Sequence, residues 1–362
     1  MGLIMLKNNK LNVDILNDSK EIIKNLGDKV NFFNNQKILI TGAAGFLGSQ
    51  FIHFFAYLNS LEILKKSCHI TLLDNFIRGK PLWISKLSQT KNFTLINSDI
   101  SKKKAFDKFN YNYIIHAASI ASPSFYRKYP IQTMDANVIG LRNLLDSCVN
   151  RNIKSFLYFS SSEIYGDPPI NEIPTNENFR GNVSCTGPRA CYDESKRFGE
   201  TLCVNFWKEK GIPIKIARPF NNYGPGLNIK DKRVIPDIFE SLIKERNIIL
   251  YSDGHATRTF CYIADAMTGY LELLLSNQNG ESFNIGTEFP EISIRKLAGT
   301  ILKISKKKNI KIINKKSTDI NYLTDNPQRR CPDIRKARNL INFNPKISLQ
   351  EGLLRTFKYY LR

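Results

Sequence analysis

The sequence lacks a long apolar run, and this absence limits what the protein can be. No stretch of its 362 residues approaches the roughly 18 consecutive apolar residues that span a bilayer. The apolar start, Met1 to Leu6, is too short for the core of a secretory signal, and Lys7 and Lys10 follow it. Leu6 also stands where an N-myristoylation signal requires Ser or Thr. We therefore expect a cytoplasmic protein without membrane contact.

Spacings typical of metal ligands are missing as well. The sequence has seven cysteines, an odd number without CxxC spacing, which favours reduced thiols and argues against a zinc site. The four histidines also show no ligand spacing; they are His53, His69, His116 and His255. We predict that the protein binds no metal.

Positive charge is abundant, but no basic stripe interleaved with aromatic residues accompanies it. The formal net charge is +21, with dense spots only at residues 102–104 and 306–308. A solvated, lysine-rich surface explains this pattern better than a nucleic-acid site does, so we expect no nucleic-acid partner. A mildly positive field would instead attract an anionic substrate.

Apolar segments alternate with helical ones through the first two thirds of the chain. The predicted strands are 37–41, 70–73, 93–97, 113–116, 155–159 and 213–217. Such alternation predicts a doubly wound parallel α/β sheet covered on both faces, and the 42% hydrophobic content is ample for its core.

The pattern changes at both ends of this region. Residues 1–35 have helical spacing, at Leu11, Ile15 and Leu26 among others, and we interpret them as a docked N-terminal helical extension. Residues 36–218 form the predicted sheet domain, which also receives part of 240–286. Residues 219–362 form most of a smaller α/β lobe, in which 309–321 reads as a solvent-edged strand and loop.

A glycine-rich turn follows the first predicted strand. In the run from Gly42 to Gly48, Gly42 permits a tight turn, Gly45 leaves room for a pyrophosphate, and Gly48 allows close packing of helix on sheet. Phe46 and Leu47 open the helix, whose N-terminal N–H groups can bind the phosphate. The turn therefore predicts a Rossmann-like dinucleotide site.

Residues at the ends of the following strands complete this predicted site. Asp74 is placed to bind the adenosine ribose hydroxyls, and its charge repels a 2′-phosphate, which favours NAD over NADP. Arg78 nearby weakens that preference. Asp99 could cap the adenine, and we include three neighbouring positions among the cofactor contacts: Asn75, Ile100 and Ala117.

Tyr192 and Lys196 are four residues apart, which places both on one face of a helix. A tyrosine base working near neutral pH needs its pKa lowered by roughly 3 units, or about 4 kcal/mol. One cation at about 4 Å, in an effective dielectric of about 20, supplies an interaction of that size, although burial opposes it. Together with the glycine turn, the pair indicates a nicotinamide-dependent enzyme that deprotonates a hydroxyl as its carbon loses hydride.

From about residue 37 to its end the chain resembles the extended short-chain dehydrogenases/reductases of the NAD-dependent epimerase/dehydratase family that act on nucleotide sugars. It is most similar to the UDP-glucuronate decarboxylases. The stretches that carry the resemblance are 74–76, 116–123, 160–168, 187–194, 218–225, 257–260 and 325–334. Those at 187–194 and 332–334 are the most specific to the decarboxylases.

The resemblance implies a reaction and assigns roles. Tyr192 would take the 4-hydroxyl proton of UDP-glucuronate while NAD takes the C4 hydride, and Lys196 would hold the nicotinamide ribose. Ser161 would bind the same hydroxyl. Ser162 and Glu163 would orient the carboxylate and help protonate C5. The 4-keto intermediate would lose CO2, and hydride return would give UDP-xylose and regenerate NAD.

The resemblance also implies substrate contacts and an assembly. Arg258 would pair with an anionic group of the substrate, Asn221 and Arg233 would contact the diphosphate, and Tyr251 would lie at the uridine end. Pro123 and Arg189 complete the expected substrate site. By analogy with the family, we expect a homodimer through residues 138–148 and the helix that carries Tyr192.

Other functions stay open at this point. A nucleotide-sugar 4-epimerase or 4-ketoreductase of the same family would use the same tyrosine and lysine. A 4,6-dehydratase is disfavoured because Ser162 occupies the position of the acid Asp that it requires. Decarboxylases usually have Thr where this chain has Ser161, a mild change. A non-catalytic nucleotide-binding protein would have no reason to keep Ser161, Tyr192 and Lys196 together.

Overall fold

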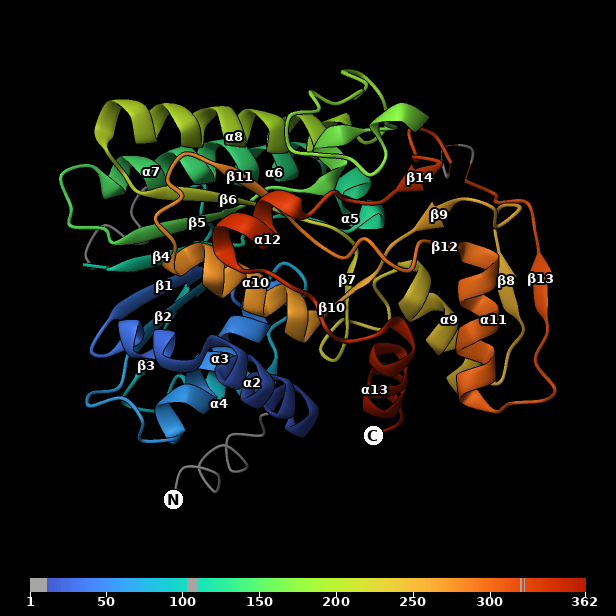
Figure 1. Cartoon of the computed structure of the whole chain (residues 1–362), viewed down its shortest axis with the longest axis horizontal. Helices are drawn as coiled ribbons and strands as arrows, with labels where there is room; N and C mark the ends of the chain where they lie inside the picture. Colours follow the sequence, from blue (N-terminus) through green and yellow to red (C-terminus); the bar gives the residue numbers. More distant parts are fainter. Residues whose placement is uncertain (1–11, 103–109, 320, 322) are drawn as a thin grey trace.

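A parallel sheet of seven strands forms the centre of the computed structural model, which describes residues 12–102, 110–319, 321 and 323–362 (Figure 1). In spatial order the strands are β11 (Ser282–Ile285), β6 (Ile214–Pro219), β5 (Ser155–Phe159), β4 (Tyr113–His116), β1 (Lys37–Thr41), β2 (His69–Asp74) and β3 (Phe93–Asn97). Every neighbouring pair is parallel. The expected doubly wound α/β fold is confirmed.

Strand bounds agree closely with the apolar segments, with one correction. The last of the predicted strands, 213–217, begins one residue later and extends to Pro219 in the structure. The extension follows from a neighbour that the local pattern does not reveal. β11 pairs with β6 as far as Ile285 opposite Pro219, and this pairing continues the strand beyond its apolar stretch.

Helices cover both faces of the sheet (Figure 1). On one face lie α2 (Val13–Leu26), η1 (Gly27–Phe33), α3 (Phe46–Ser60), α4 (Leu82–Leu87) and α10 (Ile263–Leu275). On the other lie α5 (Pro123–Lys128), α6 (Pro130–Met134), η2 (Asp135–Gly140), α7 (Leu141–Cys148) and α8 (Ala190–Lys210). Ile38 and Ile40 of β1 enter the core of the first face, and Leu39 between them enters that of the second.

Two short helical turns and the smaller lobe complete the described chain. The turns are η3 (Ser162–Tyr165) and η4 (Ile170–Glu172). The lobe and the C-terminal segment contain β7 (Asn222–Tyr223), α9 (Val234–Ile243), β8 (Ile248–Leu250), β9 (Thr257–Arg258), β10 (Cys261–Tyr262), β12 (Ile292–Ser293), α11 (Ile294–Ser305), β13 (Ile312–Asn314), β14 (Arg329–Arg330), α12 (Arg335–Ile341) and α13 (Leu349–Leu361). β13 pairs with β8 at the edge of its small sheet, as expected for 309–321.

Segments beyond residue 218 return to the large sheet. α10 packs against β5 and β6, and β11 extends the sheet next to β6. The division into domains, including the expected share of 240–286 in the first, stays a prediction. The helix expected across 138–148 is not uniform, because the π-helix η2 precedes α7.

The N-terminal extension contains a docked helix, α2, which packs against α3 and α10. Its buried apolar side chains include Ile15, Leu16 and Ile22. The Tyr262 hydroxyl donates to the buried Asp18 carboxylate at 2.9 Å, and Arg355 of α13 pairs with Glu21 at 2.7 Å. Leu11, which belonged to the predicted pattern, lies outside the described residues.

The glycine turn between β1 and α3 is very closely packed. Gly42 has φ +70°, and a Cβ there would lie 2.6 Å from the backbone of Ala117. A Cβ on Gly48 would lie 2.1 Å from the Gly42 carbonyl oxygen. Gly45 precedes α3, and no side chain caps this helix. The tight turn and the close helix packing expected of Gly42 and Gly48 are therefore present, and the helix N-terminus is free to bind an anion.

We predict that Gly48→Ala weakens NAD binding at least about tenfold and lowers the free energy of unfolding by about 2 kcal/mol, because the turn must move to admit the methyl group. Cofactor titration and urea unfolding measure the two effects. Gly299→Ala in α11 is the matched control, since nothing lies within 4 Å of its added Cβ. It should stabilise the helix by roughly 0.5–1 kcal/mol. Equal responses of the two variants would contradict this account of Gly48.

Candidate active site

A cavity of about 1100 Å³ lies at the carboxyl edge of the parallel sheet. This is the edge at which doubly wound α/β proteins bind their ligands. Of the site residues predicted from the sequence, those that line the cavity are Gly42, Gly45, Phe46, Leu47, Gly48, Asp74, Asn75, Asp99, Ile100, Ala117, Pro123, Ser161, Ser162, Glu163, Arg189, Tyr192, Lys196, Asn221, Arg233 and Arg258. Residues from both halves of the chain therefore meet in one space.

Tyr251 is the predicted site residue that does not line this cavity. It follows β8, and 41% of its surface is exposed. The next two residues, Ser252 and Asp253, line the cavity instead. The predicted contact of Tyr251 with a uridine stays a prediction.

Asp74 organises the part of the cavity next to the glycine turn. Its carboxylate accepts hydrogen bonds from the backbone N–H of Ala44 at 2.9 Å and of Phe76 at 2.7 Å. Burial raises the pKa of Asp74, although these two hydrogen bonds oppose the rise. The Asn75 amide donates to Asp99 at 3.0 Å, so the ends of β2 and β3 are joined.

Tyr192 lies near the start of α8 and is buried, with its ring stacked on that of Tyr126 at a centroid distance of 5.1 Å. Burial raises the pKa of Tyr192 to about 12, while a hydrogen bond with the Ser161 side chain lowers it. Ser161 precedes η3 and also accepts from the Glu163 N–H at 3.2 Å. The two hydroxyls therefore lie next to each other, and their expected contact with the substrate's 4-hydroxyl stays a prediction.

Lys196 lies one turn further along α8 and is fully buried. Its ammonium donates to the Phe159 carbonyl at 2.7 Å and stands 5.8 Å from the centre of the Tyr192 ring. Burial lowers the pKa of Lys196 to about 7. Burial thus opposes the lowering of the Tyr192 pKa, and the part of Lys196 in that lowering stays a prediction.

Glu163 forms an ionic cluster at the far end of the cavity from the glycine turn. Arg330 donates to both of its carboxylate oxygens, at 2.6 and 2.5 Å, and Arg189 forms a further ion pair with it. Burial opposes ionisation of Glu163, but Arg189 and Arg330 outweigh burial and lower its pKa to about 2. The carboxylate is thus ionised near neutral pH. Its expected part in protonating C5 stays a prediction.

Arg258 lies beside this cluster with a different set of partners. Its guanidinium donates to backbone carbonyls of Pro327 at 2.6 Å and Thr257 at 2.7 Å. Burial lowers its pKa to about 9. Within the described part of the chain it forms no ion pair, so its positive charge lacks a direct carboxylate partner. Such a charge suits an anionic ligand.

The remaining predicted substrate contacts come from the start of a helix and from two loops. Pro123 begins α5. The Asn221 amide donates to the Thr259 carbonyl at 2.9 Å, and Arg233 pairs with Asp231 at 3.0 Å. These side chains are already held in place where they face the cavity.

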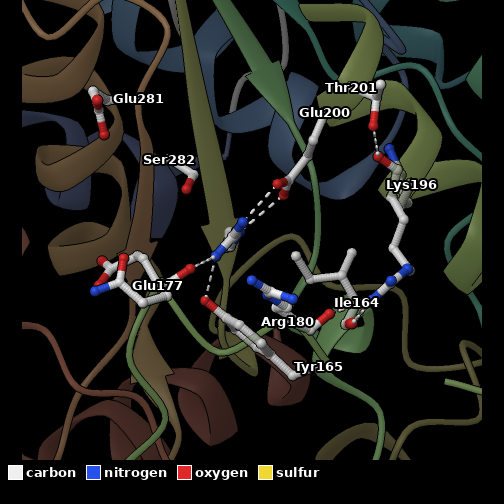
Figure 2. A network of polar contacts seen from close by, with 12 residues as sticks. Ile164, Tyr165, Glu177, Arg180, Lys196, Glu200, Thr201, Glu281 and Ser282 are labelled. Carbon is white, nitrogen blue, oxygen red and sulfur yellow. Dashed lines mark hydrogen bonds and ion pairs between the residues drawn. The ribbon is translucent and has the colours of Figure 1, made fainter. Parts of the chain in front are cut away.

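A buried network behind the cavity joins the segments that carry its reactive groups (Figure 2). Arg218 of β6 donates to both carboxylate oxygens of Glu200 on α8, at 2.9 and 2.6 Å. It also donates to the Tyr165 hydroxyl in η3 at 2.6 Å, and that hydroxyl donates to Asn284 at 2.7 Å. The network ties α8, with Tyr192, to the turn that carries Glu163.

Among the site residues that reasoning from the sequence missed, two contact predicted catalytic side chains. Arg330 lies in a motif that carried the family resemblance, yet the motif gave no sign that it would pair with Glu163 across 167 positions. Tyr126 stacks on Tyr192 from α5, and nothing in its local sequence distinguishes it from other tyrosines. Both contacts are set by tertiary packing.

No group of three or more His, Cys, Asp or Glu side chains is placed to hold a metal ion in the described residues. Over the same residues, no helix is both long and apolar enough to cross a membrane.

With this geometry established, comparison with known proteins gives the family. The model of the NAD dependent epimerase/dehydratase family matches residues 38–286, which contain the glycine turn, Ser161, Tyr192 and Lys196. The chain belongs to this family. It is therefore an enzyme of an NAD-dependent class, as the sequence predicted.

Curated relatives in this family cover most of the chain. UDP-glucuronic acid decarboxylase 1 of Danio rerio is 35% identical over 332 residues, covering 91% of this chain and 73% of the relative. UDP-glucuronic acid decarboxylase 6 of Arabidopsis thaliana is 35% identical over 322 residues, covering 89% of this chain and 88% of the relative.

Solved structures support the fold and the cofactor. A UDP-glucuronic acid 4-epimerase from Bacillus cereus, solved with UDP-glucuronic acid and NAD, has a TM-score of 0.73 and 28% identity, covering 89% of this chain and 98% of the other. A UDP-glucose 4-epimerase from Thermotoga maritima has a TM-score of 0.76 at 22% identity, covering 90% and 98%. The second likeness concerns the fold alone.

The family's cofactor is NAD, and the residues present fit it. The cradle between Gly42 and Gly48 has no room for a Cβ, and the free N-terminus of α3 faces the cavity. Ser119, which lines the cavity, has a buried hydroxyl without a protein partner. The glycine turn would hold the pyrophosphate, Asp74 the adenosine ribose, and Lys196 the nicotinamide ribose.

We predict that Glu163→Gln lowers the free energy of unfolding by about 3 kcal/mol, because it leaves buried arginines without their carboxylate. Urea unfolding at neutral pH measures the loss. Glu291→Gln is the matched control: Glu291 also accepts two bonds from one arginine, Arg329, but that arginine is 36% exposed. The control should lose less than about 1 kcal/mol. Equal decreases in the free energy of unfolding would show that the Glu163 ion pairs stabilise the fold no more than the exposed pair of Glu291 does.

Proposed function

We propose that the protein converts UDP-glucuronate to UDP-xylose and CO2 by NAD-dependent decarboxylation. One observation carries this proposal: a hydroxyl-deprotonating group of Ser161, Tyr192 and Lys196 shares its cavity with a buried arginine, Arg258, that has no ion-pair partner among the described residues. An acidic sugar would bring its carboxylate to that charge. The similarity to UDP-glucuronic acid decarboxylases over most of the chain supports the same substrate.

The first step belongs to Tyr192. As the sugar C4–H bond breaks, the Tyr192 oxygen takes the proton of the 4-hydroxyl, and Ser161 holds that hydroxyl in line. The high pKa of Tyr192 must fall for this step. The positive charge of Lys196, one helical turn away, and that of the bound cofactor both act in this direction. When bound, NAD supplies the hydride acceptor and later the hydride donor.

The second step follows from the chemistry of the oxidised sugar. A 4-keto-uronic acid is a β-keto acid, so its C5–C6 bond breaks with the electron pair moving toward the ketone, and CO2 leaves. A proton from solvent would then add at C5, and return of the hydride to C4 would give the pentose as the proton on Tyr192 returns to O4. Ser162 and Glu163 line the cavity on this side, and the ionised Glu163 keeps Arg189 and Arg330 in place.

A UDP-glucuronic acid 4-epimerase is the second candidate, favoured by the 28% identity to the Bacillus cereus enzyme of that name. It would use the same tyrosine and bind the same carboxylate, but C6 would stay on the sugar. A 4-ketoreductase would consume reduced cofactor stoichiometrically. A 4,6-dehydratase fits less well, because Ser162 cannot protonate a departing 6-hydroxyl.

The test is a time course of the purified protein with UDP-glucuronate and no added reductant, followed by NMR and mass spectrometry. We expect UDP-xylose and CO2 in equal amounts, with no net NADH. Tyr192→Phe should lower turnover at least about a thousandfold while sugar-nucleotide binding persists, because only the proton acceptor is lost. A product that retains C6 and is inverted at C4 would replace the proposal with the epimerase. No reaction would favour a neutral sugar nucleotide as substrate.

A homodimer through η2, α7 and α8 is also proposed, and the surface of these elements supports it. Ile131 on α6, Ile139 on η2 and Phe198 on α8 are 59%, 46% and 48% exposed. Large apolar side chains gathered on adjoining helices are typical of a protein interface.

We predict that the protein sediments as a dimer and that Phe198→Asp converts it to a monomer, because a charge would be buried at the interface. Leu340→Asp is the matched control, since Leu340 on α12 is equally exposed, at 49%. Sedimentation velocity distinguishes the species. A wild-type monomer, or a dimer that both substitutions disrupt alike, would contradict this interface.

A further inference from the structure

Asp231 is a buried carboxylate that lies between the two halves of the cavity. It is 2% exposed and forms ion pairs with two arginines that come from opposite sides. Arg78 follows β2, in the loop that begins after Asp74, and Arg233 precedes α9 in the smaller lobe. All three side chains line the cavity.

The position of Asp231 is fixed by its own backbone. Its carbonyl accepts a hydrogen bond from the Ser122 hydroxyl at 3.0 Å, and its N–H donates to the Asn228 carbonyl at 3.0 Å. Its carboxylate therefore presents a fixed partner to Arg78. The guanidinium of Arg78 also lies over the ring of Phe125, with 4.6 Å from its central carbon to the ring centroid.

This arrangement bears on the choice between the two nicotinamide dinucleotides. In dinucleotide folds the residues after the second strand surround the adenosine ribose. In NAD-binding proteins an acidic residue there accepts a hydrogen bond from the 2′-hydroxyl, and in NADP-binding proteins a nearby arginine binds the 2′-phosphate. This chain has both residue types there, Asp74 and Arg78, so its loop alone gives conflicting signals. In the structure Arg78 is paired with Asp231, a carboxylate that it shares with Arg233, and it lies against Phe125 of α5.

We propose that Asp231 is a specificity-determining residue that restricts the enzyme to NAD by holding Arg78 away from the adenosine ribose. A 2′-phosphate could recruit Arg78 only by removing it from a buried carboxylate. It would also lie close to the charge of Asp74, which repels it. The proposal rests on the NAD dependence of the family and not on the proposed sugar substrate.

The test compares the affinities of Asp231→Ala, Arg78→Ala and the double variant for NAD and NADP, measured by calorimetric titration without sugar nucleotide. In Asp231→Ala we expect NADP to bind about tenfold more tightly, the worth of one charge-assisted contact, with NAD affinity changed less than about threefold. Arg78→Ala should leave NADP binding weak. The double variant should bind NADP as weakly as Arg78→Ala does, because the tighter binding expected of Asp231→Ala comes from the released Arg78.

Controls separate this effect from a change in total charge and from misfolding. Asp253→Asn removes a different carboxylate from the cavity lining, one that is 71% exposed, and should leave NADP affinity unchanged. Asp231→Asn keeps the shape of the side chain and should show the same direction of change if Asp231→Ala unfolds. A gain that persists in the double variant, or NADP affinity unchanged in both Asp231 variants, would overturn the proposal. Since no sugar nucleotide is present, neither outcome depends on decarboxylation.

Discussion

The hydrogen bonds from Arg218 to Glu200 are the interaction on which the geometry of the site depends. A buried guanidinium must find acceptors for all its donors, and Arg218 finds them on α8, in η3 and in the Glu177 carbonyl. Tyr192 and Glu163 sit on the first two of these elements. Packing on a sheet alone would allow a helix many positions. The hydrogen bonds of the planar Arg218 guanidinium have fixed directions, and they restrict α8 to few of these positions. The distance between the segments that carry Tyr192 and Glu163 therefore depends on Arg218, which does not line the cavity.

The parts of the molecule that were predictable from the sequence are those determined by nearby residues. Strand periods, the glycine turn and the four-residue spacing of Tyr192 and Lys196 depend on local sterics, and each was found where expected. The end of β6 at Pro219 was not, because it depends on pairing with β11. The same distinction holds for electrostatics: the spacing of Tyr192 and Lys196 indicates a cation that lowers the Tyr192 pKa, whereas the opposing effect of burial beside Tyr126 depends on tertiary packing.

The ion pairs in the site also depend on tertiary packing and could not be predicted from the local sequence. The sequence indicated that Glu163 and Arg189 belong to one site, but not that Arg330 and Arg189 together hold Glu163 ionised. It placed Arg78 near the cofactor, but not in a pair with Asp231 across 153 positions. Which charges meet is decided by the fold as a whole. The sequence can thus indicate which residues belong to a site without indicating the ion-pair partners or the ionisation of each side chain.

The docking of α2 has a consequence for how the chain is made. Its apolar face packs on α10, and two of its acids form ion pairs at the C-terminus: Glu21 with Arg355 of α13, and Asp14 with Arg362, which follows α13, at 2.8 Å. A ribosome releases α2 long before it has synthesised those partners. Until residue 275 has been synthesised, the buried side chains of α2 lack the helix α10 on which they pack, and the ion pairs with Arg355 and Arg362 form later still. Helix α2 is thus synthesised early, but its packing is complete only when a partner 334 positions further along the chain has folded against it.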